Sequence, residues 1–419
     1  MDKIIIHGNN PLRGKIQIHG AKNAVLPLMA ASILAESPCV LHNVPCLHDV
    51  FTMDKLLTQM GIQIEFTGRY MTISVPNRIS PVAPYDLVRK MRASFFILGP
   101  LLARYGKARV SLPGGCAIGT RPVDIHLKGL EQLGARIRLE EGYVIAEGKL
   151  KGADIYLDFP SVGATENLMM AATRAKGTTR LFNPAQEPEI VDLANFLNKL
   201  GAKIEGAGTE VITIKGTKSL NGTEHHVIPD RIEAGTFLIA GLSTNGDIQV
   251  NNVIPEHLHT FITKLSEMGA DIQIGTHSIR VKSPAKPLKA INITTLPYPG
   301  FPTDLQAQVM ALLTCVEGTS IIKETVFENR FIHAAELIRM GADISLEGNT
   351  AIIRGVKQLY GAPVMASDLR ASAALVIAGL MAKEGETIIS RVYHLDRGYE
   401  RIEERLASLG ADIQRIHEE

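Results

Sequence analysis

"EMGADI", residues 267–272, is a hexapeptide whose glycine ends an amphipathic helical pattern and whose next residues alternate as in a strand. Close variants occur at five other places: QMGIQI (59–64), QLGARI (132–137), KLGAKI (199–204), RMGADI (339–344) and SLGADI (408–413). The shared glycines follow one another at intervals of 73, 67, 68, 72 and 69 residues. The chain therefore consists of six copies of a unit of about 70 residues.

A second helix of a different kind precedes each of these glycines by roughly 40 residues. These segments are apolar on nearly every face and rich in Ala, Gly and Ser, which is typical of helices buried on all sides. They cover residues 21–35, 91–103, 163–175, 232–243, 304–315 and 369–382. The repeat thus predicts helices and strands arranged around six closely packed, buried helices.

The polar residues of the buried helices gather at the N-terminal ends: Lys22, Asn23, Arg92, Thr165, Glu166, Arg231, Glu233, Asp304, Asp368 and Arg370. Helix capping is a fair explanation for Asp304 and Asp368. It does not explain Lys22 and Arg92, because a cation at a helix N-terminus opposes the macrodipole. A repeated geometry brings such ends to one side of each domain, so we expect the cations and backbone N–H groups to bind an anion.

Six copies could form one ring or two groups of three. The Gly/Asn/Thr-rich stretch IKGTKSLNGTEHHVIPD (214–230) precedes the fourth buried helix and favours two groups, with a boundary near residue 229. We expect one domain over residues 22–229 with repeats 1–3. The second domain is expected to contain residues 1–21 and 230–419 with repeats 4–6, and the active site is expected in a cleft between the two domains.

Composition excludes several classes of partner. The chain has 419 residues, 45% of them hydrophobic and 21% charged, with a formal net charge of +1. It lacks the long Lys/Arg runs of a nucleic-acid-binding protein, and its apolar runs are shorter than the roughly 20 residues that cross a bilayer. The start of the sequence lacks a signal-peptide pattern, so we expect a cytoplasmic protein without membrane insertion.

One cysteine stands out in the loop SLPGGCAIGTRPVD (111–124). Cys116 lies between a predicted strand and a predicted outer helix, close to the helix start and to Arg121, which are two reasons for a lowered thiol pKa. The residues alone also allow an ordinary loop cysteine. No phosphate loop, dinucleotide fingerprint, nucleophile elbow or metal-binding motif is present in the sequence.

Several long motifs resemble the bacterial enolpyruvyl transferases that act on UDP-N-acetylglucosamine. They are GAKNAVLP (20–27), MRASFFILGPLLAR (91–104), LPGGCAIGTRPVD (112–124), FPSVGATEN (159–167), GFPTDLQAQ (300–308) and ENRF (328–331). The resemblance implies an inside-out α/β barrel of six βαβαββ repeats, arranged as two domains of three repeats.

The implied reaction moves the enolpyruvyl group of phosphoenolpyruvate to the 3-hydroxyl of UDP-N-acetylglucosamine and releases phosphate. It proceeds by addition and elimination, requires no metal or organic cofactor, and is the first committed step of peptidoglycan synthesis. Because such enzymes react with the epoxide fosfomycin at this cysteine, the resemblance also implies covalent inhibition at Cys116.

The same resemblance implies roles for individual residues. Cys116 delivers a proton to the enol or assists product release, two possibilities that the sequence leaves open, and Asp304 is the base. Phosphoenolpyruvate is bound by cations: Lys22, Arg92, Arg121, Arg330 and Arg397, of which Lys22 and Arg397 are also taken as catalytic. The nucleotide sugar is bound by Asn23, Arg121, Pro122, Val123, Asp124, Ile125, Ser161, Val162, Gly163, Asp304 and Val326. Asp368 and Arg370 are expected near the reacting centre, although capping explains Asp368 almost as well.

Two rival functions fit the repeat. The shikimate-pathway enolpyruvyl transferase would share a cationic pocket but use another acceptor, and its motifs do not include the cysteine loop. A binding protein that had kept the fold without catalysis would be expected to lack Lys22, Cys116, Asp304 or Arg397. All four are present, so the sequence favours the enzyme that acts on the nucleotide sugar.

Overall fold

The computed structural model describes residues 2–89, 91–112 and 123–417. These residues form an α/β structure with six mixed sheets of four strands each, which confirms the predicted fold class. They divide into two compact units. One unit contains residues 2–19 and 229–417, and the other contains residues 20–89, 91–112 and 123–228.

Three sheets are each built from the four strands of one repeat. They are β6 (Val82–Ala83), β7 (Lys107–Ser111), β8 (Arg136–Glu140) and β9 (Tyr143–Glu147); β10 (Asp154–Tyr156), β11 (Thr178–Phe182), β12 (Lys203–Glu205) and β13 (Val211–Lys215); and β18 (Ile293–Thr294), β19 (Thr319–Lys323), β20 (Asp343–Glu347) and β21 (Thr350–Arg354). In each sheet the first two strands are parallel and the other pairs are antiparallel. A buried helix connects the parallel strands, as a parallel crossover requires.

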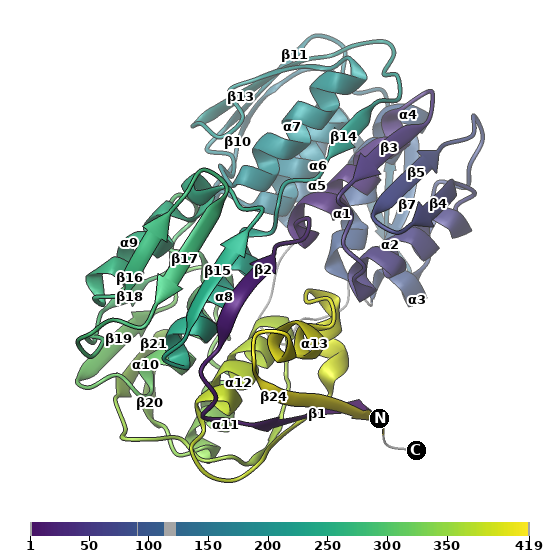
Figure 1. The fold of residues 1–419 in the computed structure, drawn as a ribbon. Helices are drawn as coiled ribbons and strands as arrows, with labels where there is room; N and C mark the ends of the chain where they lie inside the picture. The colour runs from purple at the N-terminus through teal and green to yellow at the C-terminus, as the bar shows by residue number, and fades with distance from the viewer. Residues whose placement is uncertain (1, 90, 113–122, 418–419) are drawn as a thin grey trace. The chain divides into compact units, whose positions relative to one another are not determined.

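The other three sheets have the same pattern but take one strand from a distant part of the chain (Figure 1). β14 (Glu224–His226) pairs with β3 (Cys39–His42) in the sheet of β4 (Gln63–Thr67) and β5 (Tyr70–Ser74). β2 (Arg13–Gln17) pairs with β15 (Asp247–Asn251) in the sheet of β16 (Asp271–Ile274) and β17 (Ser278–Lys282). β1 (Asp2–His7) lies between β23 (Thr387–Ser390) and β24 (Asp412–His417), with β22 (Pro363–Met365) at the edge. The N-terminal strands therefore complete sheets of the C-terminal half.

The buried helices occupy the segments that the sequence predicts: α1 (Lys22–Ala31), α4 (Leu98–Tyr105), α6 (Val162–Ala172), α8 (Arg231–Ser243), α10 (Gln306–Leu313) and α12 (Leu369–Met381). In α12 every residue is buried. Short 3-10 turns, η2 (Arg92–Ile97) and η4 (Thr303–Leu305), lead into α4 and α10. Each unit has its own hydrophobic core around its three buried helices.

The outer helices end at the repeat glycines. They are α2 (His48–Gln59), α5 (Asp124–Gln132), α7 (Pro188–Leu200), α9 (His259–Glu267), α11 (Ala334–Arg339) and α13 (Ile402–Ala407). All six glycines have φ between +91° and +109°, the left-handed conformation that glycine adopts most easily, which confirms the prediction. The remaining short helices are η1 (Ser32–Leu34), α3 (Tyr85–Val88), η3 (Pro255–Leu258) and η5 (Val392–Arg397). None of the helices in the described residues has the length and apolar character needed to cross a membrane.

Candidate functional site

The structure describes the predicted site residues except Cys116, Arg121 and Pro122, which lie outside the described residues. Six belong to the unit of residues 2–19 and 229–417: Asp304, Val326, Arg330, Asp368, Arg370 and Arg397. The others belong to the unit that contains residues 20–89: Lys22, Asn23, Arg92, Val123, Asp124, Ile125, Ser161, Val162 and Gly163.

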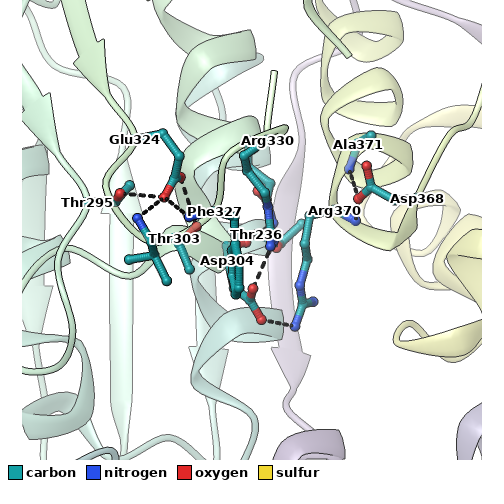
Figure 2. Close-up of polar contacts among 12 residues, drawn as sticks. Thr236, Thr295, Thr303, Asp304, Glu324, Phe327, Arg330, Asp368, Arg370 and Ala371 are labelled. Atoms are coloured by element: carbon teal, nitrogen blue, oxygen red, sulfur yellow. Dashed lines mark hydrogen bonds and ion pairs between the residues drawn. The ribbon is translucent and has the colours of Figure 1, made fainter. Parts of the chain in front are cut away.

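In the first unit, Asp304 lies between two buried arginines (Figure 2). Nη2 of Arg330 donates to Oδ1 of Asp304 at 2.8 Å, and Nη2 of Arg370 donates to Oδ2 at 2.9 Å. Both arginine side chains are only 4% exposed, whereas that of Asp304 is 25% exposed. Asp304 is thus an oriented carboxylate with one side accessible to a ligand.

The starts of the three buried helices of this unit converge on Arg370, as the repeat predicts. Arg370 is in the first turn of α12, Asp304 is in η4 before α10, and Asp230 is the N-cap of α8. Burial alone would lower the pKa of Arg370, but Asp304, Tyr399 and Asp230 raise it above its ordinary value. The guanidinium group is therefore charged at any pH at which the protein is folded.

Asp368 and Asp304 have different roles, although capping was a fair explanation for both. Oδ1 of Asp368 accepts hydrogen bonds from the backbone N–H groups of Arg370 and Ala371 at 2.9 and 3.1 Å. Asp368 is therefore the N-cap of α12. The carboxylate of Asp304 binds the two arginines instead, so the capping explanation is wrong for this residue.

Glu324 is a buried anchor beside Asp304 that the sequence analysis did not single out (Figure 2). Its Oε1 accepts from Oγ1 of Thr295 at 2.7 Å and from the backbone N–H groups of Val326 and Phe327 at 2.8 and 3.2 Å. Its Oε2 accepts from Oγ1 of Thr303, the residue before Asp304, at 2.8 Å. One carboxylate thus holds the segment that contains Val326 and the turn that presents Asp304.

Arg397 is the last residue of η5 and is half-buried. Gly398 follows it, and a Cβ atom at this position would lie 2.7 Å from Cδ2 of Leu369 in α12. The glycine therefore lets the chain after Arg397 approach the start of α12 closely.

In the second unit, Lys22 begins α1 and its Nζ lies 3.6 Å from Oδ2 of Asp49 in the first turn of α2. The side chains are 14% and 4% exposed. Asp49, which the sequence analysis missed, offsets the unfavourable position of a cation at a helix N-terminus. Asn23 is the next residue of α1 and is half-buried.

Arg92, at the start of η2, lies close enough to the buried His126 of α5 to affect its charge. The pKa of His126 is lowered to about 3, mainly by burial and to a smaller extent by the charge of Arg92. His126 is therefore neutral at pH 7, and Nδ2 of Asn167 lies 3.1 Å from its Nδ1. A Cβ atom on Gly163 would lie 3.3 Å from Cε1 of His126, so these predicted segments meet around this histidine.

The predicted nucleotide-binding segments begin two helices. Ser161 is the N-cap of α6, where its Oγ accepts from the N–H of Ala164 at 3.3 Å, and Val162 and Gly163 form the first turn. Val123 is the N-cap of α5 and Asp124 its first residue. First-turn N–H groups have no partner within a helix and are suited to an anion such as a diphosphate. Within the described residues, no group of three or more His, Cys, Asp or Glu is arranged to hold a metal ion.

Comparison with known proteins identifies the family of this chain. The family model of EPSP synthase (3-phosphoshikimate 1-carboxyvinyltransferase) matches residues 6–406. The chain belongs to the EPSP synthase family. Two curated relatives named UDP-N-acetylglucosamine 1-carboxyvinyltransferase, from Magnetococcus marinus and Nitratidesulfovibrio vulgaris, are 59% and 56% identical to it. These matches cover 99% and 100% of this chain and 100% of each relative.

Two solved structures have the same fold. The enolpyruvyl transferase NikO from Streptomyces tendae has a TM-score of 0.90 at 27% identity, over 99% of this chain and 98% of its own. An EPSP synthase from Acinetobacter baumannii has a TM-score of 0.76 at 20% identity, over 99% and 100% of the two chains. The resemblance inferred from the motifs is thus confirmed.

The contacts of Glu324 predict different outcomes for two substitutions. Glu324→Ala leaves several buried donors without an acceptor and should lower the free energy of unfolding by about 2–4 kcal/mol. Glu324→Gln keeps one carbonyl oxygen and can donate to the Thr303 hydroxyl, so its cost should stay below about 1 kcal/mol. Urea unfolding of both variants measures the difference, and equal losses would contradict the anchoring role.

The lowered pKa of His126 predicts a loss of stability in acid. An unfolded histidine binds a proton near pH 6.5 whereas His126 in the folded state does so near pH 3, so the unfolded state gains protons first as the pH falls. Stability should therefore decrease from about pH 6.5 downward. His126→Asn, which keeps an acceptor for Asn167, should make the thermal midpoint less dependent on pH in this range. An unchanged slope would show that His126 does not contribute.

Proposed function

We propose that the protein transfers the enolpyruvyl group of phosphoenolpyruvate to the 3-hydroxyl of UDP-N-acetylglucosamine and releases phosphate, in a step of peptidoglycan synthesis. One observation carries this conclusion: full-length relatives with this enzyme name are 56–59% identical to the chain. The solved EPSP synthases share only 20–21% of its residues. The nucleotide sugar is therefore favoured over shikimate 3-phosphate as the acceptor.

The chemistry has two steps. The sugar oxygen adds to the second carbon of phosphoenolpyruvate while a proton is added to the terminal methylene carbon. Elimination then removes a proton from the same terminal carbon and releases phosphate from the second carbon. The product is an enolpyruvyl ether. The first step needs a base at the hydroxyl and an acid at the methylene, and both steps need cations around the phosphate and carboxylate.

Asp304 suits the position beside the acceptor hydroxyl. Two guanidinium groups keep its carboxylate ionised and oriented, and a carboxylate has about four acceptor positions, so it can also accept a hydrogen bond from a sugar hydroxyl. We therefore assign to Asp304 the orientation of the hydroxyl and the acceptance of its proton as the new C–O bond forms.

Phosphoenolpyruvate carries two acidic groups, and the cations assigned to it come from separate elements. Lys22 begins α1, Arg92 begins η2 and Arg397 ends η5, so the proposed roles fall on residues of both units. Arg121 and Arg330 complete the set implied by the motifs, and Cys116 is the proposed proton donor. Cytoplasmic location likewise remains a prediction from the sequence.

The test is phosphate release from phosphoenolpyruvate with UDP-N-acetylglucosamine, beside a parallel reaction with shikimate 3-phosphate. We expect release with the nucleotide sugar alone. Release with shikimate 3-phosphate alone would keep the reaction and overturn the acceptor. Release with neither would support a binding protein that has kept the fold without catalysis.

Fosfomycin tests the role of Cys116. The epoxide should inactivate the protein by alkylating this thiolate, with a mass increase on the peptide that contains Cys116. Cys116→Asp should keep activity, because a carboxyl group can also deliver a proton, and should resist the epoxide. Full activity of the unchanged protein in excess fosfomycin, with substrate present, would contradict the assignment.

A further inference from the structure

Tyr399, two residues after Arg397, is the centre of a buried hydrogen-bond network in the unit of residues 229–417. Its side chain is among the largest in the core and is only 1% exposed. Its hydroxyl lies 2.8 Å from Oγ1 of Thr236 in α8, 3.2 Å from Nε2 of Gln308 in α10 and 3.2 Å from Nη1 of Arg370 in α12. One oxygen atom therefore joins the three buried helices of this unit. We call these four side chains the Tyr399 hub.

The hydrogen bonds of the hub have a defined direction. A guanidinium group has no acceptor, so Arg370 donates to the hydroxyl of Tyr399. Thr236 donates its own proton to the backbone oxygen of Ile232 at 2.8 Å, so it accepts from Tyr399. Burial raises the pKa of Tyr399, so at neutral pH its hydroxyl keeps the proton that it donates to Thr236.

The hub contacts Asp304 in two ways. Arg370 binds Tyr399 with Nη1 and the carboxylate of Asp304 with Nη2, so the hydroxyl fixes the guanidinium plane that orients this carboxylate. Gln308 binds Tyr399 and also donates to the backbone oxygen of Asp304 at 2.9 Å. Both the side chain and the backbone of Asp304 thus depend on groups that the Tyr399 hydroxyl holds.

Tyr399 also anchors the segment that contains Arg397. The N–H groups of Gly398 and Tyr399 donate to the backbone oxygen of Leu395 in η5 at 3.1 and 3.0 Å. Because the ring of Tyr399 is locked in the core, the end of η5 is fixed relative to α12. Tyr399 therefore connects Arg397, through its ring and backbone, with Asp304, through the groups that its hydroxyl holds.

We propose that Tyr399 is a positioning residue for the transfer reaction. Its hydroxyl holds Asp304, through Arg370 and Gln308, in a fixed position relative to Arg397. This role rests on the proposed function, in which Asp304 faces the sugar hydroxyl and Arg397 faces phosphoenolpyruvate. The hydroxyl contacts neither substrate. Its effect is on the rate of the reacting complex, because small displacements of reacting groups slow a reaction strongly.

Tyr399→Phe removes the hydroxyl and keeps the ring. We expect kcat to fall about tenfold, with KM for phosphoenolpyruvate within about threefold of the original, because the lost alignment matters most in the transition state. Thr236→Val should lower kcat in the same direction, since it removes the acceptor for the Tyr399 proton. The double variant should lose no more than the larger single loss, because both changes break one network.

Thr244→Val is the matched control. Thr244 lies at the other end of α8, and its hydroxyl donates to the backbone oxygen of Ala240 as that of Thr236 donates to Ile232. The control should lower the thermal midpoint as Thr236→Val does, but kcat should stay within about twofold of the original. A similar fall of kcat in Thr244→Val, or an unchanged kcat in Tyr399→Phe, would overturn the proposal and leave Tyr399 a structural residue.

Measurements on the protein without substitutions distinguish failure of this proposal from failure of the proposed function. If it releases phosphate with UDP-N-acetylglucosamine and the variants keep the kcat of the Thr244→Val control, the positioning role of Tyr399 is overturned and the proposed function stands. If it uses shikimate 3-phosphate instead, the proposed acceptor is overturned. The same comparison of kcat values, made with shikimate 3-phosphate, then tests the positioning role of Tyr399. If it turns over neither acceptor, both proposals fail.

Discussion

Helices that are buried on every side restrict where chemistry can take place in this fold. A charged side chain in the middle of such a helix would lose its water at a high cost in free energy, so charged groups are placed near the helix ends. In α12 every residue is buried, and its acidic and basic residues, Asp368 and Arg370, are the N-cap and the second helical position. Because the repeat packs three such helices together in each unit, their ends meet.

Charged side chains that meet at these helix ends must form ion pairs or hydrogen bonds with one another. Arg330 and Arg370 are nearly fully buried, and a buried guanidinium group without a partner would cost several kcal/mol. Asp304 pairs with both, the hydroxyl of Tyr399 accepts from Arg370, and Thr236 accepts the proton of that hydroxyl. The groups that stabilise this end of the unit are thus the ones proposed to act on the substrate. Function and stability are coupled at the same residues.

The residues that the sequence analysis missed have partners far away in the chain. Glu324 binds Thr295, which is 29 residues earlier, and Tyr399 binds Thr236 across 163 residues. Glu324 also accepts from the nearby N–H groups of Val326 and Phe327, but no motif or repeat in the sequence singled out either residue. Asp304 and Arg370 were singled out as polar residues at the starts of buried helices, and Asp304 and Arg330 also lie in motifs that resemble a known family. Their residue types alone did not distinguish a cap from an ion pair, as Asp304 shows.

The sequence by itself determined the six-fold repeat, the α/β class, the buried helices and the left-handed glycines, because these depend on local periodicity and on the conformational freedom of single residues. It also indicated that charged residues would gather at the helix starts. Only the tertiary structure decided which charges pair, that β14 pairs with β3 and β1 with β24, and that one tyrosine hydroxyl joins three helices. Pairing across long separations depends on how the packed helices and sheets bring distant residues together, and that information lies in the whole chain, not in any local stretch.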